Sequence, residues 1–469
     1  MTVSTTSHPL PPLLPGAPLV GSAFEITRDR LAFNQRLNEL GSVGRFRMFN
    51  LEIYHAGEPA AVQHILQDNA RNYVKGPLFD VMRNLVGNGL FLSDGDFWLR
   101  QRRMMQPAFH HRRLAGLVDG MAAETRVSID QWARAASASQ PINMAEETTA
   151  LAMRVVTRAL FSSGLAGSER RLAEAITALI DEISFRFNMP FYPPLGFPTP
   201  RNLRTRRAQR TLDDEVYTII AHRRANPDVK DDLLAMLMEA RDEEDNQGMS
   251  DQQLRDEVLI MFAAGHETTA NAMAWAIYEL DRHPAVLARL RAEVDEVLAG
   301  RDPAVSDLPR LTYVRQVIDE VLRIHPPVWI TNRQAVKDDA ICGYRIPAGA
   351  MVSISPYALQ RDPRYWENPL AFDPERFSPE KSTARPRFAY FPFGGGPRQC
   401  IGKDFALYEA AVVLAMITQR FEWKMVPGEI VEPHPRATLR PNAVWINLQE
   451  RNGFSPTHQS AKTHFSKMI

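Results

Sequence analysis

The 469-residue sequence has little cysteine, no surplus of either charge and no long apolar run. Its two cysteines lie in dissimilar segments, which argues against a disulfide framework and fits a reducing cytoplasm. Basic and acidic residues number 55 each, so no overall bias favours nucleic acid or an anionic membrane. No segment near the start approaches the ~20 apolar residues of a membrane span. We therefore expect a cytoplasmic protein without a membrane anchor, whose proline-rich residues 1–20 form an extended arm.

Neither an internal repeat nor a low-complexity linker divides the chain, so 1–469 is expected to form a single domain. The spacing of apolar residues predicts a mainly α fold with small β-sheets. Helices are expected over 114–134, 143–161, 173–187, 207–225 and 313–324, and strands within 44–55, 329–355 and 421–448. Cys342 lies in a predicted short strand as a small buried residue. The polar stretch 451–469 is expected to be a disordered tail.

The longest predicted helix spans 250–282. Ser250 and Gln253 form a capping box at its start, and His283-Pro284 ends it. Its middle is apolar nearly all round, which predicts a helix that runs through the core.

Cys400 lies in a glycine-rich segment, Phe393-Gly-Gly-Gly-Pro-Arg398-Gln-Cys400-Ile-Gly402. A thiolate needs nearby positive charge and backbone N–H groups, and Arg398 stands two residues before it. The glycines leave room for a flat macrocycle and allow unusual backbone angles. A buried cysteine beside a turn is the alternative interpretation.

This segment resembles the haem-binding signature of the cytochromes P450, the haem-thiolate monooxygenases, and the likeness is to bacterial members without an anchor. The resemblance makes Cys400 the axial ligand of haem b iron. It implies a haem held between the Cys400 loop and the long central helix, with Phe393 and Gly402 beside it.

Within the long helix, Ala264-Gly-His-Glu267-Thr268-Thr matches the family's A-G-x-[DE]-T-[TS] motif. A Thr268 hydroxyl bonded back to the carbonyl of Ala264 would open the helix at one point. Glu267 and Thr268 are then the catalytic pair that delivers protons. A cluster of capping threonines is the alternative, and a zinc-binding H-E-x-x-H is excluded by alanine at position 270.

Two further motifs follow in family order. Glu320-Val-Leu-Arg323 and the Arg376 of Pro374-Glu-Arg-Phe resemble a structural triad beneath the haem. Gln360 departs from a position where many relatives have histidine.

The haem propionates have their own predicted ligands. Trp98 and Arg102, four residues apart, face one side of a helix and resemble a propionate-binding pair. Arg398 and Arg333 are predicted to bind the other propionate. A surface arginine is the alternative in each case.

The resemblance implies an enzyme that activates O2 and inserts one oxygen atom into an apolar molecule by hydroxylation or epoxidation. A fatty acid, terpenoid, steroid or polyketide-like product of secondary metabolism is expected. Pocket candidates with almost no charge are Phe79, Met82, Phe187, Met261, Val328 and Trp329, although each aromatic could equally be core packing.

Electrons are expected to come from NAD(P)H through a separate ferredoxin or flavodoxin and its reductase, because only 67 residues follow Gly402. The basic residues predicted to form the docking face are Arg102, Arg103, His110, His111, Arg112, Arg113, Arg398 and Lys403. The protein is expected to be a monomer that binds no nucleic acid.

Three competing hypotheses differ in the residues that they require. A peroxygenase or isomerase, or a haem protein that only carries a ligand, has no need of the Glu267–Thr268 pair. A glycine-loop nucleotide binder is excluded because no G-x-x-x-x-G-K-[ST] is present.

Overall fold

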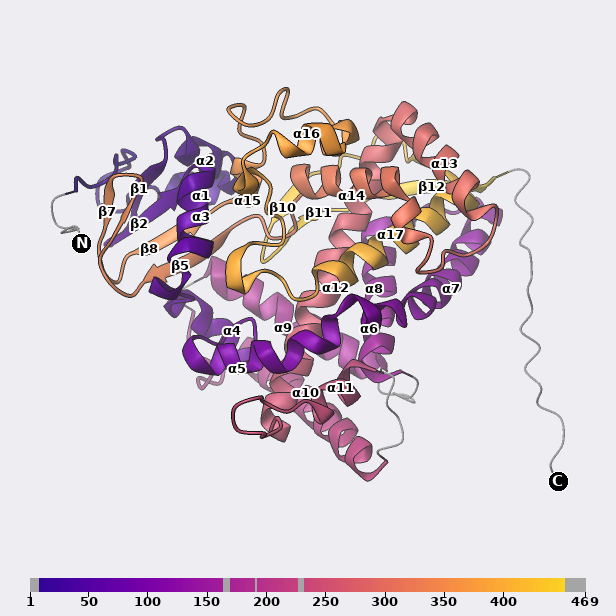
Figure 1. Ribbon diagram of the computed structural model, residues 1–469, viewed down its shortest axis with the longest axis horizontal. Coiled ribbons are helices and arrows are strands. Elements are labelled where there is room, and N and C mark those ends of the chain that lie inside the picture. The colour runs from indigo at the N-terminus through magenta and orange to yellow at the C-terminus, as the bar shows by residue number, and fades with distance from the viewer. Residues whose placement is uncertain (1–7, 163–168, 190–191, 227–231, 452–469) are drawn as a thin grey trace.

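The computed structural model describes residues 8–162, 169–189, 192–226 and 232–451. Helices fill most of the molecule, and a five-stranded sheet lies at one end, on the left of Figure 1. Residues 452–469 of the predicted tail 451–469, and residues 1–7 of the arm, lie outside the described residues. The expectation of a mainly α fold with small sheets is confirmed.

The helices vary from single turns to a span of 32 residues. They are α1 (Ala23–Arg28), α2 (Arg30–Asn38), α3 (Pro59–Gln63), α4 (Asp80–Val86), α5 (Gly95–Met105), α6 (His111–Ala115), α7 (Val118–Ser137), α8 (Met144–Phe161), α9 (Glu169–Asn188), α10 (Pro200–Ala225), α11 (Leu233–Glu239), α12 (Asp251–Arg282), α13 (Pro284–Leu298), α14 (Thr312–Ile324), α15 (Pro356–Leu359), α16 (Pro379–Thr383) and α17 (Lys403–Arg420). Helix α10 begins seven residues before the predicted 207 because Thr199 caps it and Pro200 occupies its first turn, both local signals that apolar spacing misses.

The strands form four small sheets. Those of the largest follow the order β1-β2-β8-β5-β3, in which only β2 and β8 pair in parallel. The strand bounds are β1 (Val43–Met48), β2 (Leu51–Ala56), β3 (Tyr73–Val74), β4 (Ile142–Asn143), β5 (Thr331–Ala335), β6 (Asp339–Ile341), β7 (Tyr344–Ile346), β8 (Met351–Ile354), β9 (Phe421–Met425), β10 (Pro433–Pro435), β11 (Leu439–Pro441) and β12 (Trp445–Glu450).

Cys342 corrects one expectation. It lies in the turn between β6 and β7 with φ 49°, and its side chain is exposed rather than buried in a strand. The alternating pattern predicted one strand, whereas Gly343 at φ 82° lets the chain reverse there. In the described part of the arm, the N–H of Leu14 donates to the carbonyl of Arg45 in β1, and the N–H of Arg45 donates to the carbonyl of Pro12.

Helix α12 crosses the middle of the molecule, as its pattern predicted (Figure 1). Ser250 and Gln253 form the predicted capping box, and the helix ends at Arg282 before His283. It contacts α8, α10 and α17 along its length, and Phe262, Trp275 and Leu280 on it are at most 1% exposed. This helix is the central element of the main core.

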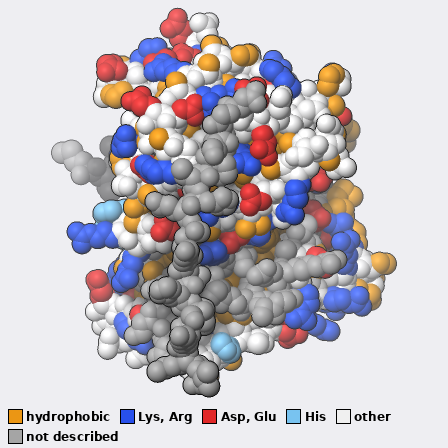
Figure 2. All heavy atoms as spheres, turned by 90° about the vertical axis from the view of Figure 1, so that its right-hand side faces the viewer, with side chains coloured by type: hydrophobic (Ala, Val, Ile, Leu, Met, Phe, Trp, Pro, Cys, Tyr) orange, Lys and Arg blue, Asp and Glu red, His pale blue; other side chains and the backbone are white. Residues whose placement is uncertain are grey.

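Basic and acidic side chains are interspersed over the face seen in Figure 2, as their equal numbers suggest. Within the described part of the chain, no helix combines the length and the apolarity needed to cross a membrane.

Candidate active site

The Cys400 loop is folded by its glycines. Gly394 and Gly396 adopt φ values of 68° and 66°, and the backbone N–H of Cys400 donates to the carbonyl of Phe393 at 3.0 Å. A Cβ on Gly396 would lie 1.8 Å from the carbonyl oxygen of Leu66. The room that these glycines provide is therefore needed, at least in part, for close approach of the protein's own backbone.

The Cys400 thiol is accessible to solvent-sized molecules, although burial among protein atoms raises its pKa. The N–H of Gly402 and the positive charge of Arg102 act in the opposite sense and lower the pKa of the thiol. These are the groups that would offset the charge of a thiolate.

Helix α5 brings Trp98 and Arg102 to this loop. The Arg102 guanidinium donates to the carbonyl of Gln399 at 2.9 Å. The guanidinium of Arg398 lies over the Trp98 ring, 4.4 Å from its centroid. The predicted pair and the predicted loop arginine thus meet in one place.

Buried positive charge exceeds negative charge beside the loop. Arg398 donates to Asp94 at 2.7 Å and to the carbonyl of Ser93 at 2.9 Å. Burial and the charge of Arg398 lower the pKa of Arg333 to about 10. Burial, then the charges of Arg333 and Arg398, hold the pKa of Lys75 well below its usual value. Among the described residues, Asp94 is the carboxylate that attracts all three of these cations, and Arg83 also lies 4.0 Å from it.

Lys75 is the functional candidate that sequence reasoning missed. Its ammonium lies 4.9 Å and 4.1 Å from the ring centroids of Phe79 and Phe91, and the residue is 6% exposed. A lysine among Tyr73, Val74 and Phe79 was the available signal, because a lysine inside an apolar segment has to find a partner for its charge.

The middle of α12 has one accessible spot inside the core. The Thr268 hydroxyl donates to the carbonyl of Ala264 at 2.7 Å, as predicted. The helix nevertheless runs unbroken through this segment, so the predicted opening of the helix is not seen as an interruption of α12. Ala264 is exposed, whereas Phe262 is fully buried and His266 is 3% exposed. A Cβ on Gly265 would lie 3.0 Å from Val156, so this glycine lets α8 pack closely.

Glu267 has a different hydrogen-bond partner from Thr268, the next residue on α12. Its carboxylate accepts a hydrogen bond from the Thr438 hydroxyl at 2.8 Å, just before β11. It also lines a hollow of about 1100 Å³ whose other walls come from α7, α8, α9 and the chain around Arg440. Thr268 is not among the described residues that line this hollow.

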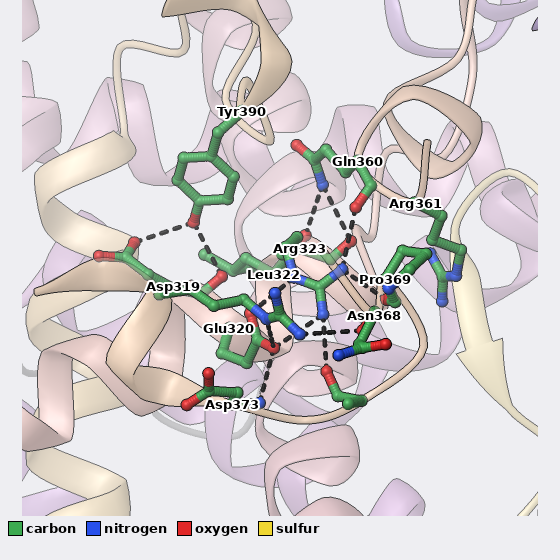
Figure 3. A network of polar contacts seen from close by, with 12 residues as sticks. Asp319, Glu320, Leu322, Arg323, Gln360, Arg361, Asn368, Pro369, Asp373 and Tyr390 are labelled. Atoms are coloured by element: carbon green, nitrogen blue, oxygen red, sulfur yellow. Dashed lines mark hydrogen bonds and ion pairs between the residues drawn. The ribbon is translucent and has the colours of Figure 1, made fainter. Parts of the chain in front are cut away.

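Glu320 joins two helical segments through two arginines. Its carboxylate accepts two hydrogen bonds from Arg323, at 2.6 and 2.7 Å, and lies 3.4 Å from Arg376 (Figure 3). Arg323 also donates to the carbonyls of Gln360, Pro369 and Ala371. Two arginines thus share one carboxylate, and backbone carbonyls accept their remaining hydrogen bonds.

Gln360 belongs to the same network. Its side chain donates to the carbonyls of Leu322 and Arg323 and accepts from the N–H of Phe391. It therefore ties α14 to the start of the Cys400 loop, which is a nearer connection to the site than the sequence indicated.

The predicted pocket residues are in varied surroundings. Phe79 is 6% exposed, and Met82 and Met261 are partly buried against the main core. Trp329 is 5% exposed, packs in a separate cluster with Leu31 and Leu439, and donates to the carbonyl of Arg436. Val328 is 41% exposed, and the side chain of Phe187 lies outside the described residues. Their contact with a substrate stays a prediction.

Comparison with known proteins identifies the family. The model of the family described as Cytochrome P450 matches residues 11–445. The chain belongs to the cytochrome P450 family, and it is a monooxygenase. This membership implies the use of haem and O2.

Similar proteins come from bacterial secondary metabolism. Cyclooctatin synthase of Streptomyces melanosporofaciens is 37% identical over 430 residues, which cover 90% of this chain and 92% of that protein. Pentalenene oxygenase of Streptomyces avermitilis is 34% identical over 443 residues, which cover 93% and 97%. The solved haem domain of cytochrome P450DA superimposes with a TM-score of 0.86 at 27% identity, covering 96% of this chain and 98% of that one.

The residues present fit a haem. Cys400 is exposed, and so is Ala264, a small residue in the middle of α12. Lys75, Arg333 and Arg398 share only Asp94 among them, as expected of a site that receives the carboxylates of a ligand.

Proposed function

We propose that this monooxygenase hydroxylates or epoxidises a terpenoid, with Cys400 as the axial ligand of haem b. When bound, the haem supplies the activation of O2, and a thiolate ligand favours cleavage of the O–O bond. The observation that carries the proposal is that Cys400 is exposed and lies beside the N–H of Gly402 and the charge of Arg102, which act to lower the pKa of its thiol against the effect of burial.

The haem would be held between the Cys400 loop and the middle of α12. Ala264 would allow close approach from the helix, and Phe393 and Gly402 would flank the sulfur. Trp98, Arg102, Arg333, Arg398 and Lys75 would bind its propionates. Ligand carboxylates would offset the burial, and then the repulsion from Arg333 and Arg398, that lower the pKa of Lys75.

Proton supply would depend on two neighbours on α12. Thr268 would hold a water molecule close to the reacting oxygen, and Glu267 would carry protons to that water. Consecutive helix residues point about 100° apart, so the two side chains can serve the reaction space and the hollow respectively. This division supports a monooxygenase over a haem protein that only carries a ligand.

The relatives and the pocket support an apolar substrate. Cyclooctatin synthase and pentalenene oxygenase are named for terpenoid compounds. Phe79, Met82 and Met261 add apolar surface without charge. A pocket of this kind orients a hydrocarbon by shape and excludes water.

Electron delivery would use the surface near Cys400. Helix α6, with His110 before it, contacts α17, which begins directly after the Cys400 loop. His110, His111, Arg112 and Arg113 are all exposed. We propose that an acidic ferredoxin docks on these residues, with electrons ultimately from NAD(P)H.

The absorption spectrum of the reduced, carbon-monoxide-bound protein tests the proposal. Wild type should show the band of a thiolate-ligated haem, and Cys400→Ser should lose it. Cys342→Ser is the matched control, since this exposed cysteine lies in the β6–β7 turn, and it should retain the band. A wild-type spectrum typical of histidine-ligated haem would refute the assignment.

A further inference from the structure

A directed chain of hydrogen bonds ends on Glu267. The side-chain amide of Asn271 donates to the Thr438 hydroxyl oxygen at 3.0 Å, and that hydroxyl donates to Glu267 at 2.8 Å. An amide nitrogen can only donate, so the Thr438 oxygen is the acceptor and its single proton is directed at Glu267. Glu267 therefore takes part as an acceptor, which suits an ionised carboxylate.

Thr438, whose hydroxyl is the donor to Glu267, is held in place by its surroundings. Thr438 and Asn271 are 8% and 5% exposed. The next residue, Leu439, is fully buried, and its N–H donates to the carbonyl of Pro327 at 2.9 Å. A partly buried hydrogen bond from a residue next to β11 restricts the carboxylate more than a bond from a mobile surface side chain would.

The position that this bond selects lies on the wall of the hollow between α8, α9 and α12. The wall is polar where Glu267 meets it, with His266, Asn271, Thr149 and Arg440 among its residues. The charge of Arg440 is attracted by Glu267 and by Asp181 across the hollow. A space of about 1100 Å³ with such a lining has room for water.

We propose that Thr438, oriented by Asn271, is a positioning residue that holds the Glu267 carboxylate at this hollow, where it collects the protons that it passes toward Thr268. The inference rests on the proposed function, because only a reaction that consumes protons gives Glu267 this task. Thr438 acts through Glu267 and is not itself catalytic.

The transfer balances at each step. A water in the hollow, protonated from solvent, gives a proton to Glu267, and a new O–H bond forms on the carboxyl group. Loss of the negative charge weakens the bond from Thr438, since hydrogen bonds to ionised groups are about twice as strong as neutral ones. The side chain then turns and gives the proton to the water held by Thr268. Glu267 returns to Thr438 as a carboxylate.

The test compares Thr438→Val, which keeps the shape and loses the hydroxyl, with Thr438→Ser, which keeps it. Thr149→Val is the matched control, because Thr149 lines the same hollow but donates to the carbonyl of Ala145 on its own helix. Crystal structures give a measurement independent of turnover. The Glu267 carboxylate should leave the β11 end in Thr438→Val and stay there in the other two variants.

Turnover supplies the second measurement. With spinach ferredoxin, its reductase and NADPH, and no substrate, the ratio of peroxide to water formed reports on proton supply. We expect this ratio to rise about threefold to tenfold in Thr438→Val, short of the roughly 10²–10⁴-fold contribution of a general acid, because Glu267 itself remains. Thr438→Ser and Thr149→Val should match wild type.

An unmoved Glu267 together with an unchanged ratio in Thr438→Val would overturn the inference. If that variant does not retain haem, Asn271→Leu replaces it: the hydroxyl stays but loses its fixed direction, and a smaller rise is expected, with no rise counting against the inference. The carbon-monoxide spectrum of every variant separates this outcome from failure of the proposed function, which only a wild-type spectrum without thiolate ligation would show.

Discussion

Two clusters of buried arginines in this protein are built from similar side chains and differ in how their charges are matched. In the first, Arg323 and Arg376 share the carboxylate of Glu320, and several backbone carbonyls complete the network (Figure 3). In the second, Arg333 and Arg398 lie with Lys75 around Asp94 alone. Two cations share one carboxylate in the first cluster and three share one in the second, so the second carries the larger excess of positive charge.

The difference separates a structural role from a binding role. Removing one partner from a matched buried pair leaves an uncompensated charge, so the first cluster contributes to the folded state itself. An unmatched buried cation costs free energy, so we predict that the second cluster favours a state in which an anionic ligand is bound. Burial of arginine alone would not tell the two apart.

The largest expected effect is on the matched cluster. Glu320→Gln leaves Arg323 and Arg376 buried without a carboxylate, and we expect a loss of about 3–5 kcal/mol in the free energy of unfolding. Denaturant unfolding of the apoprotein measures it. Glu25→Gln is the control, since its ion pair with Arg36 is on the surface, with side chains 41% and 49% exposed, and it should cost at most about 1 kcal/mol. Equal losses of unfolding free energy in Glu320→Gln and Glu25→Gln would show that the buried Glu320 cluster contributes no more to stability than a surface ion pair.

A smaller effect, on haem affinity, is expected in the unmatched cluster. Lys75→Met should weaken haem binding about tenfold or more, because a hydrogen bond to a charged group contributes about 1.5–3 kcal/mol. The apoprotein should be no less stable than wild type, since repulsion from Arg333 and Arg398 is relieved. Haem transfer to apomyoglobin measures the affinity, and exposed Lys337→Met is the control. Loss of apoprotein stability without loss of affinity would assign Lys75 to the structural class.

The pH dependence of the apoprotein sharpens the same comparison. The pKa of Lys75 is held well below its usual 10.5 in the folded state, by burial first and then by Arg333 and Arg398. Between these two values the unfolded chain binds more protons at this residue, so its contribution to stability rises with pH. The free energy of unfolding of wild type should therefore rise relative to that of Lys75→Met as pH increases, by at most about 1.4 kcal/mol per pH unit. If the free energies of unfolding of wild type and Lys75→Met changed in parallel from about pH 7 to about pH 10, the pKa of Lys75 would not be lowered in the folded state.

The smallest effect extends the comparison to the surface. Arg103 pairs with Asp242 and Glu244, whereas no ion pair is recorded for Arg112 or Arg113 within the residues that the structure describes. Reversing Arg112 to Glu should slow reduction by an acidic ferredoxin a few-fold at low salt, with the difference vanishing as salt rises. Arg103→Ala, which removes an already neutralised charge, should change the rate less. If Arg103→Ala slowed reduction more than the change of Arg112 to Glu, the ferredoxin would dock on another part of the surface.

Local patterns predicted the features that depend on neighbours in sequence. The capping box of Ser250 and Gln253, the end of α12 before His283-Pro284 and the Thr268–Ala264 bond span at most four residues each. The positive φ values of Gly394 and Gly396 belong to the same class. Such contacts follow from helix geometry and the backbone freedom of glycine, whatever the rest of the chain does.

Contacts between distant segments were beyond those patterns. Glu267 meets Thr438 across 171 residues, and the Gln360 amide reaches Phe391 across 31. The gathering of Lys75 with Arg333 and Arg398 has the same origin. The sequence by itself determined the family motifs, the long central helix and the cysteine that would bind iron. Which charged groups gather in the interior depended on tertiary contacts, because charge balance in a low-dielectric interior depends on what surrounds each group in space.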